Sequence, residues 1–219
     1  FMDIKIDSRT VIVFDLDDTL YNELSYLKSA YIEIAQSLSP KNWQSLYSRM
    51  LSLYRDQKNV FLYLSENWPI EKAKLIESYR NHFPNITLFE GARQLLTDIK
   101  AKDGKLALIT DGRSLTQRNK LKALQIEDLF DKVIISEEIG SEKPNINNYL
   151  AIERQFPNSS YCYIADNLKK DFIVPNERGW NSIGLIDNGM NIHFTSHQYL
   201  NDSSSPKGFI VSLKEITIA

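Results

Sequence analysis

Apolar and polar positions follow two different patterns along the second part of the chain. After about residue 88, short apolar runs are separated by longer stretches in which apolar residues recur at helical intervals. Apolar runs with little alternation are typical of strands covered on both faces, and strands that alternate with helices favour βαβ units around a parallel sheet. The expected strands are 10–14, 105–109, 132–135, 161–165 and 182–185, and the expected helices are 91–102, 115–124 and 145–156.

The stretch from residue 21 to residue 83 has a different pattern. It lacks strand-like runs, and its apolar and aromatic residues recur at helical spacing, which predicts helices. Pro40 and Pro69 mark breaks between these helices, and Pro84 marks the return to the alternating pattern. We therefore expect an α/β protein with a Rossmann-like parallel sheet, helices on both of its faces, and a small all-helical domain. The main domain covers 1–20 and 84–219, and the helical domain covers 21–83.

The last thirty residues predict a loop and one more strand. Residues 188–207 contain Asn188-Gly189 and a serine-rich run before Pro206, which is typical of a surface loop. Residues 208–213 favour a short strand, and Ser212 is a candidate cap for a helical turn over 214–216.

Length and composition agree with this organisation and limit the classes of binding partner that the sequence indicates. A chain of 219 residues suits a main domain with a smaller insert, and 42% hydrophobic with 25% charged residues is typical of a globular protein. The formal net charge is -2, with basic residues spread along the chain, so neither nucleic acid nor an anionic membrane is indicated as a partner. We expect a small-molecule partner; the oligomeric state stays open.

Cysteine usage and the N-terminal residues predict a cytoplasmic location. The single cysteine, Cys162, lies in an apolar run and is expected to be a buried, inert thiol. The first nine residues include charged positions instead of an apolar signal core, and no segment approaches the roughly 18 to 20 apolar residues of a membrane span. The three histidines have no metal-like partners nearby and are expected to be structural loop residues: His82, His193 and His197.

The strongest chemical pattern is a carboxylate cluster directly after the first strand. Asp15, Asp17 and Asp18 stand within four residues of one another, and such mutual repulsion is usually relieved by a divalent cation. Mg²⁺ takes oxygen ligands from one or two carboxylates together with phosphate oxygens, so the cluster favours phosphoryl chemistry. The alternative is a polar turn in which Asp17 or Asp18 caps the first helix of the insert.

Three later segments carry the remaining parts of such a site. A hydroxyl and successive backbone amides in the turn 110–112 can hold phosphate oxygens, and Lys143 can neutralise both a phosphate and a carboxylate. Asp166 follows another strand and is suited to complete a metal site, with Asp171 five residues later. Because the carboxyl ends of parallel strands meet at one edge of the sheet, we expect these segments to converge.

This ordered set of segments resembles the four motifs of the haloacid dehalogenase-like superfamily of phosphotransferases. The resemblance spans nearly the whole chain, and the first motif with its hydrophobic strand is highly specific. The superfamily's helical cap between motifs one and two corresponds to the insert 21–83. One departure is Ala165, where glycine commonly precedes the metal-binding aspartate. The matching residues are 15–19, Thr110, Lys143, Ala165-Asp166-Asn167 and Asp171.

The resemblance implies a role for each matching residue. Asp15 is the implied nucleophile, and Asp17 is the implied general acid that later serves as the base. The implied cofactor is Mg²⁺, held by the side chains of Asp15 and Asp166 and by the backbone carbonyl of Asp17, with Asp171 orienting a ligand. The implied phosphate-binding residues are Thr110, Asp111, Gly112 and Lys143.

The resemblance implies a phosphatase that hydrolyses a small phosphorylated metabolite, such as a nucleotide or sugar phosphate, through an aspartyl-phosphate. Two alternatives stay open at this point. A phosphomutase would use the same motifs and intermediate, and a non-catalytic metabolite-binding module would keep the fold without turnover. The insert contains no recognisable substrate signature, so the physiological substrate is not specified.

Overall fold

Six parallel strands form the main sheet of the computed structural model, which describes residues 2–201 and 203–219. The order across the sheet is β4-β3-β2-β5-β6-β7, so β2, the strand directly before Asp15, lies in the centre. The expected strands are all present in the sheet. Their bounds are β2 Thr10–Phe14, β3 Lys105–Thr110, β4 Lys132–Ile135, β5 Ser160–Ala165, β6 Asn181–Leu185 and β7 Gly208–Ile210.

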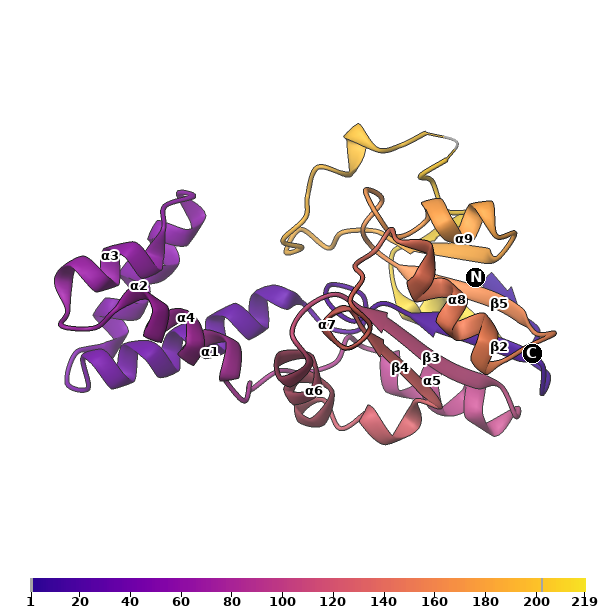
Figure 1. Cartoon of the computed structure of the whole chain (residues 1–219), viewed down its shortest axis with the longest axis horizontal. Helices are drawn as coiled ribbons and strands as arrows, with labels where there is room; N and C mark the ends of the chain where they lie inside the picture. The colour runs from indigo at the N-terminus through magenta and orange to yellow at the C-terminus, as the bar shows by residue number, and fades with distance from the viewer. Residues whose placement is uncertain (1, 202) are drawn as a thin grey trace.

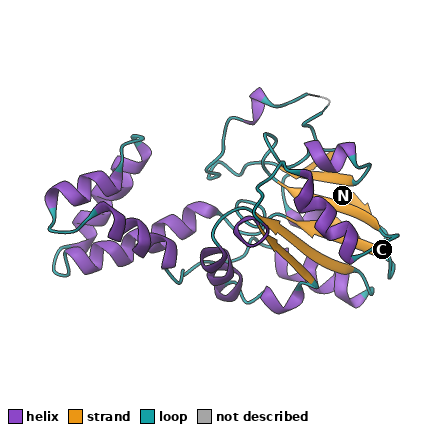
Figure 2. Ribbon diagram, viewed as in Figure 1, coloured by secondary structure: helices purple, strands orange, loops and turns teal. Residues whose placement is uncertain are grey.

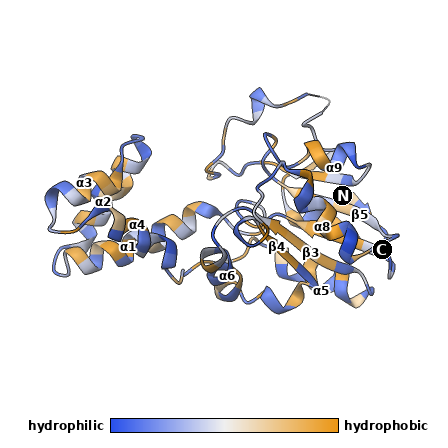
Figure 3. Cartoon of the chain, viewed as in Figure 1, coloured by the Kyte–Doolittle hydropathy of each residue, from blue (hydrophilic) through white to orange (hydrophobic). Residues whose placement is uncertain are grey.

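Helices cover both faces of this sheet, which explains the continuous apolar runs of its strands (Figures 2 and 3). Ile12 and Phe14 of β2 pack into a core with α5 (Ala92–Ala101) and α6 (Ser114–Ala123). Val11 and Val13 point to the other face and pack with α8 (Ile146–Gln155) and α9 (Ile173–Glu177). The predicted α/β fold with helices on both faces is therefore confirmed.

The two ends of the chain form a feature that the sequence pattern did not predict. β1 (Met2–Ile4) and β8 (Ile216–Ile218) pair in parallel as a separate two-stranded sheet. The expected strand 208–213 ends at Ile210, and Ser212 accepts a hydrogen bond from the Lys214 amide at the start of a 3-10 turn, η3 (Leu213–Glu215). Two three-residue strands far apart in sequence carry too short a pattern to be recognised separately.

The segment after the Asp15 motif forms four helices that extend to one side of the sheet (Figure 1). α1 spans Glu23–Leu38, α2 Trp43–Arg55, α3 Val60–Asn67 and α4 Lys72–Asn81, and they share a core of their own. The break between α2 and α3 was not expected, because no proline marks it. Gln57 has a positive φ of 57° there, and Asn59 caps α3 by accepting a hydrogen bond from the Leu62 amide.

Short elements complete the connections: η1 (Glu127–Leu129), α7 (Ser136–Ile139) and η2 (Ser196–Gln198). Among the described residues, no helix has the length and apolar character needed to cross a membrane. The register aligns Phe14 of β2 with Leu108 of β3 and with Ile164 of β5. The segments that follow these strands therefore meet at one edge of the sheet, next to the start of α1.

Candidate active site

Asp15 lies at the centre of this edge because β2 ends one residue before it. Its backbone amide donates to the Ile164 carbonyl (3.0 Å), which continues the pairing with β5. Its carboxylate accepts hydrogen bonds from Lys143 Nζ (2.6 Å) and from the Thr19 hydroxyl (3.3 Å). Burial, only partly opposed by Lys143 and reinforced by Asp171, raises the pKa of Asp15 to about 7. Neutralising the negative charge of a neighbouring carboxylate would therefore lower the pKa of Asp15 and favour its ionised form.

Three buried carboxylates crowd together at this point. Oxygen atoms of Asp15, Asp166 and Asp171 all lie within 4.8 Å of one another. Burial and then the charges of Asp15 and Asp171 raise the pKa of Asp166 well above its ordinary value. Asp166 accepts hydrogen bonds from Asn191 Nδ2 (3.0 Å) and from the Thr19 hydroxyl (3.3 Å). The donor set of crowded carboxylate oxygens fits a hard divalent cation such as Mg²⁺.

Lys143 is the cation buried among these acids. Its Nζ atom lies 2.6 Å from Asp15 Oδ1, 2.7 Å from Asp171 Oδ1 and 3.2 Å from the Tyr163 hydroxyl. Burial lowers the pKa of Lys143, but Asp15 and Asp171 outweigh it and raise the pKa well above its ordinary value. The charged form of Lys143 is therefore favoured, and its ammonium links the nucleophile candidate to Asp171.

Asp17 lies on the other side of the loop and outside this carboxylate cluster. Its side chain accepts hydrogen bonds from Lys120 Nζ (2.7 Å), Gln117 Nε2 (2.9 Å) and the Tyr21 hydroxyl. Burial raises the pKa of Asp17, but Lys120 and then the other two donors outweigh it, so the pKa lies below its ordinary value. Asp17 is therefore held ionised in this arrangement.

Asp18 confirms the structural alternative for one member of the cluster. It has a positive φ of 57°, and its two carboxylate oxygens accept hydrogen bonds from the backbone amides of Glu23 and Ile192, both at 2.8 Å. Asp18 thereby caps the start of α1 and holds the loop after β6 against it. The helix-cap interpretation applies to Asp18, whereas Asp17 is bound by side chains.

The turn after β3 brings its predicted residues to the same edge. The Thr110 hydroxyl accepts a hydrogen bond from Gln117 Nε2 (2.5 Å), which links this turn to Asp17. The Gly112 amide donates to the Ser136 hydroxyl (2.8 Å), so this N–H is already engaged. The Asp111 carboxylate accepts from the Lys143 amide (3.0 Å) and from Lys170 Nζ (2.6 Å).

A cavity of about 110 Å³ opens between these groups. Asp15, Asp17, Thr110, Asp111 and Asp166 line it, so these sequence-predicted positions share one space, whereas Gly112 and Lys143 are not among its lining residues. Of the other lining residues, Asp18 and Asn167 belong to motif segments that the sequence already indicated. Glu23, Lys170 and His193 had no site role assigned from the sequence.

Two of these lining residues change the expectations from sequence. His193 was expected to be a structural loop residue, but the loop after β6 carries it into the wall of the active-site cavity. Glu23, in the first turn of α1, faces the same cavity, where burial and then Asp17 raise its pKa to about 8. No motif could identify either residue, because each reaches the cavity only through the tertiary fold.

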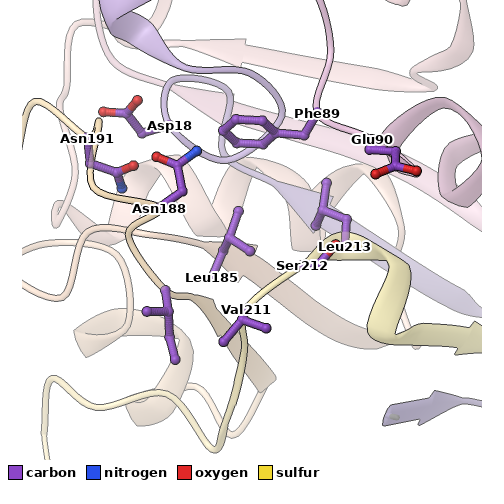
Figure 4. Close-up of a pocket in the computed structure, with 10 residues that line it drawn as sticks. Asp18, Phe89, Glu90, Leu185, Asn188, Asn191, Val211, Ser212 and Leu213 are labelled. Atoms are coloured by element: carbon purple, nitrogen blue, oxygen red, sulfur yellow. The ribbon is translucent and has the colours of Figure 1, made fainter.

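A second cavity, of about 180 Å³, shares the lining residue Asp18 with the first. Figure 4 shows the residues that line this second cavity. Its floor is apolar, with Leu185, Val211, Leu213 and Phe89. Two of its polar lining residues have partners within the protein. Asn188 exchanges two hydrogen bonds with Asn22 (3.2 and 3.0 Å), and Glu90 forms an ion pair with Lys214 (2.8 Å).

Several residues that hold the site were not predicted from the sequence. Gln117 and Lys120 stand three positions apart in the helix after Thr110, so helical spacing placed them on one face, but their partner Asp17 is about a hundred residues earlier. Asn191 is in the stretch expected to be a surface loop, yet it donates to Asp166. Only the fold brings these partners together.

A parallel sheet with carboxylates, a buried lysine and a hydroxyl at its carboxyl edge defines a Rossmann-like α/β protein with an acidic site. The family model of the haloacid dehalogenase-like hydrolases matches residues 12–185, and the chain belongs to this family. The resemblance inferred from the motifs is thus confirmed.

Relatives with assigned names fall in the same group. The chain is 28% identical to the pyrimidine 5'-nucleotidase YjjG of Escherichia coli, over 94% of this chain and 95% of that protein. It is 31% identical to a glyceraldehyde 3-phosphate phosphatase of Methanothermobacter thermautotrophicus, over 62% of this chain and 66% of that protein. Its fold is similar to that of the HAD-hydrolase YfnB of Bacillus subtilis bound to magnesium, with a TM-score of 0.64, 19% identity, and coverage of 94% of this chain and 96% of that one.

Proposed function

We propose that this hydrolase is a Mg²⁺-dependent phosphatase that acts on a small phosphorylated metabolite. The observation that carries the proposal is the buried pair of Asp15 and Lys143, 2.6 Å apart, next to Asp166 and across one cavity from Asp17. A carboxylate whose ionised form is favoured by a paired cation, and which lines a cavity, can attack phosphorus. The relatives named as a nucleotidase and as a phosphatase support phosphate esters as the substrate class.

In the proposed reaction, a carboxylate oxygen of Asp15 attacks phosphorus and the bond to the ester oxygen breaks. Asp17 donates a proton to the leaving oxygen, and an aspartyl-phosphate remains on Asp15. Asp17 then takes a proton from water as that water attacks phosphorus, which releases phosphate and restores Asp15. Asp17 can act as the acid only after it leaves Lys120 and Tyr21, because both contacts favour its ionised form.

The residues that would hold Mg²⁺ are Asp15 and Asp166, with the Asp17 carbonyl as a third protein ligand and Asp171 in support. The ion would supply positive charge to the phosphate oxygens and favour ionised Asp15. Asn191 and Thr19 orient Asp166 by hydrogen bonds of 3.0 and 3.3 Å. Magnesium bound to YfnB, which has the same fold, is consistent with this assignment.

We propose that residues 21–83 are a cap domain on a catalytic core of 1–20 and 84–219. α1 starts at the cavity, and its first residue, Glu23, lines it. The far end of the helical segment also contacts the core, because Thr116 of α6 donates to the Arg80 carbonyl (2.7 Å). A domain attached in this way can close over the phosphate and exclude water during transfer.

The cytoplasmic location stays a prediction.

A screen of phosphorylated metabolites with Mg²⁺ tests the proposed function. We expect nucleoside monophosphates or sugar phosphates to be hydrolysed by the wild type and by no more than about a thousandth of that rate by Asp15→Asn. Absence of turnover above the Asp15→Asn control, also on an aryl phosphate, would contradict hydrolysis. Transfer of labelled phosphate from the protein to a sugar hydroxyl instead of water would indicate a phosphomutase, and metabolite binding without turnover would indicate the non-catalytic module.

A further inference from the structure

The ammonium group of Lys143 is surrounded by oxygen atoms of the protein. A lysine ammonium has three N–H donors and no more. Three oxygen atoms already lie within 3.2 Å of Lys143 Nζ, those of Asp15, Asp171 and the Tyr163 hydroxyl. The Lys143 side chain is also 1% exposed. Lys143 donates hydrogen bonds to Asp15 and Tyr163, forms an ion pair with Asp171 and is not among the residues that line the cavity, so its ammonium mainly neutralises the carboxylates.

Lys170 is placed differently at the same cavity. It lines the cavity together with Asp15 and Thr110, and 28% of its side chain is exposed. Among the described residues, its ammonium has one hydrogen-bonded partner, Asp111 Oδ2 at 2.6 Å. Two of its three donors are thus available to a ligand in the cavity.

Asp111 holds Lys170 in this position. Its other carboxylate oxygen accepts the backbone amide of Lys143 (3.0 Å), so Asp111 connects the lysine to a fixed point of the main chain. The backbone of Lys170 is also held, because its amide donates to the Asn167 carbonyl (3.1 Å) within the turn before Asp171. A carboxylate beside a phosphate-binding turn would repel phosphate by itself, and a paired ammonium removes this repulsion.

We infer that Lys170, anchored by Asp111, donates directly to the oxygens of the transferred phosphoryl group, while Lys143 serves the carboxylates. This inference rests on the proposed function, because it assigns a binding residue in the phosphate site. Burial and then Lys143 lower the pKa of Lys170, but Asp171, Asp111 and Asp15 outweigh them and raise it above its ordinary value, which favours the charged form.

Calorimetric binding of inorganic phosphate in the presence of Mg²⁺ tests the inference without any turnover. We expect Lys170→Met and Lys170→Gln to weaken phosphate binding by about 10- to 100-fold, as for the loss of hydrogen bonds from a charged donor. Lys170→Arg retains the charge and should stay within about fivefold of the wild type. Lys169→Met is the matched control, because it removes the neighbouring exposed lysine, and it should change binding by less than about twofold.

The double variant Asp111→Asn with Lys170→Met separates direct binding from simple charge cancellation. If Lys170 donates to phosphate, the double variant binds phosphate as weakly as Lys170→Met. Recovery to the wild-type affinity would show that Lys170 only cancels the charge of Asp111 and would overturn the inference. Unchanged affinity in both single neutral variants, or no measurable phosphate binding by the wild type, would overturn it as well. Turnover by the wild type and its loss in Asp15→Asn report on the proposed function separately.

Discussion

The ion pair between Asp17 and Lys120 allows a quantitative test of how the proposed acid–base residue is held. Lys120 Nζ lies 2.7 Å from Asp17 Oδ1, and the two side chains are 5% and 18% exposed. Removing one member of a buried pair leaves the other charge without its partner and costs about 3–5 kcal/mol. Asp17 keeps hydrogen bonds from Gln117 and Tyr21 and faces the cavity, so we expect a smaller loss for Lys120→Met, about 2–3 kcal/mol of unfolding free energy.

Urea denaturation of the wild type, Lys120→Met, Asp17→Asn and the double variant measures this interaction. We expect a coupling free energy of about 1.5–3 kcal/mol between the two positions, as for a hydrogen bond between charged groups. The melting temperature of Lys120→Met should fall by roughly 4–10 °C for a chain of this length. Lys122→Met removes an exposed lysine of the same helix and should cost less than about 1 kcal/mol.

The pH dependence of this loss follows from the lowered pKa of Asp17. A group whose pKa is lower in the folded than in the unfolded protein stabilises the fold above the unfolded value, here 3.8, and this contribution disappears as the pH falls through the folded value. The difference between wild type and Lys120→Met should therefore be constant between about pH 5 and pH 7 and shrink below about pH 4. A coupling below about 0.5 kcal/mol, or a difference that persists unchanged at acid pH, would refute this reasoning.

Three further outcomes are expected. Asn191→Ala removes the hydrogen bond to Asp166 and should weaken Mg²⁺ binding by about 10- to 100-fold in calorimetry, whereas a change below about twofold would show that Asp166 is oriented without it. Mg²⁺ at about a hundred times its dissociation constant should add about 2.7 kcal/mol of stability, seen as a rise of roughly 5–10 °C in melting temperature that EDTA reverses; no rise would contradict a metal site at the carboxylate cluster. Cys162 is buried, which raises its pKa to about 12, so iodoacetamide at pH 8 should label it only in urea, and rapid labelling of the folded protein would contradict the packing of β5.

The strands and most helices of the core follow from the sequence alone. The apolar runs of β2, β3 and β5 are continuous because both faces of each strand are covered, and this gives a pattern that a single sequence displays. The carboxyl ends of parallel strands meet at one edge of the sheet, which predicts from the sequence that Asp15, Thr110 and Asp166 lie together. Local pattern and topology rules are sufficient for groups that directly follow a strand.

Local patterns and topology rules do not predict the contacts that loops make. The stretch from Asn188 onward has the composition of an ordinary surface loop, and the structure shows that it crosses to Asp18, Asp166 and Asn22. The partners of its hydrogen bonds are separated by 166, 25 and 174 positions in the sequence. No local conformational preference specifies such pairs. For the same reason β1 and β8 were missed, since each is three residues long and pairs with a strand at the other end of the chain.

The sequence by itself therefore determined the fold class, the family and the position of the nucleophile candidate, because these depend on periodicity and on which residues follow each strand. The tertiary structure decided how the charges are paired: Lys143 with Asp15 and Asp171, Lys120 with Asp17, and Lys170 with Asp111. The physical reason is that an ion pair depends on distance and burial in space, which the spacing of residues along the chain does not specify.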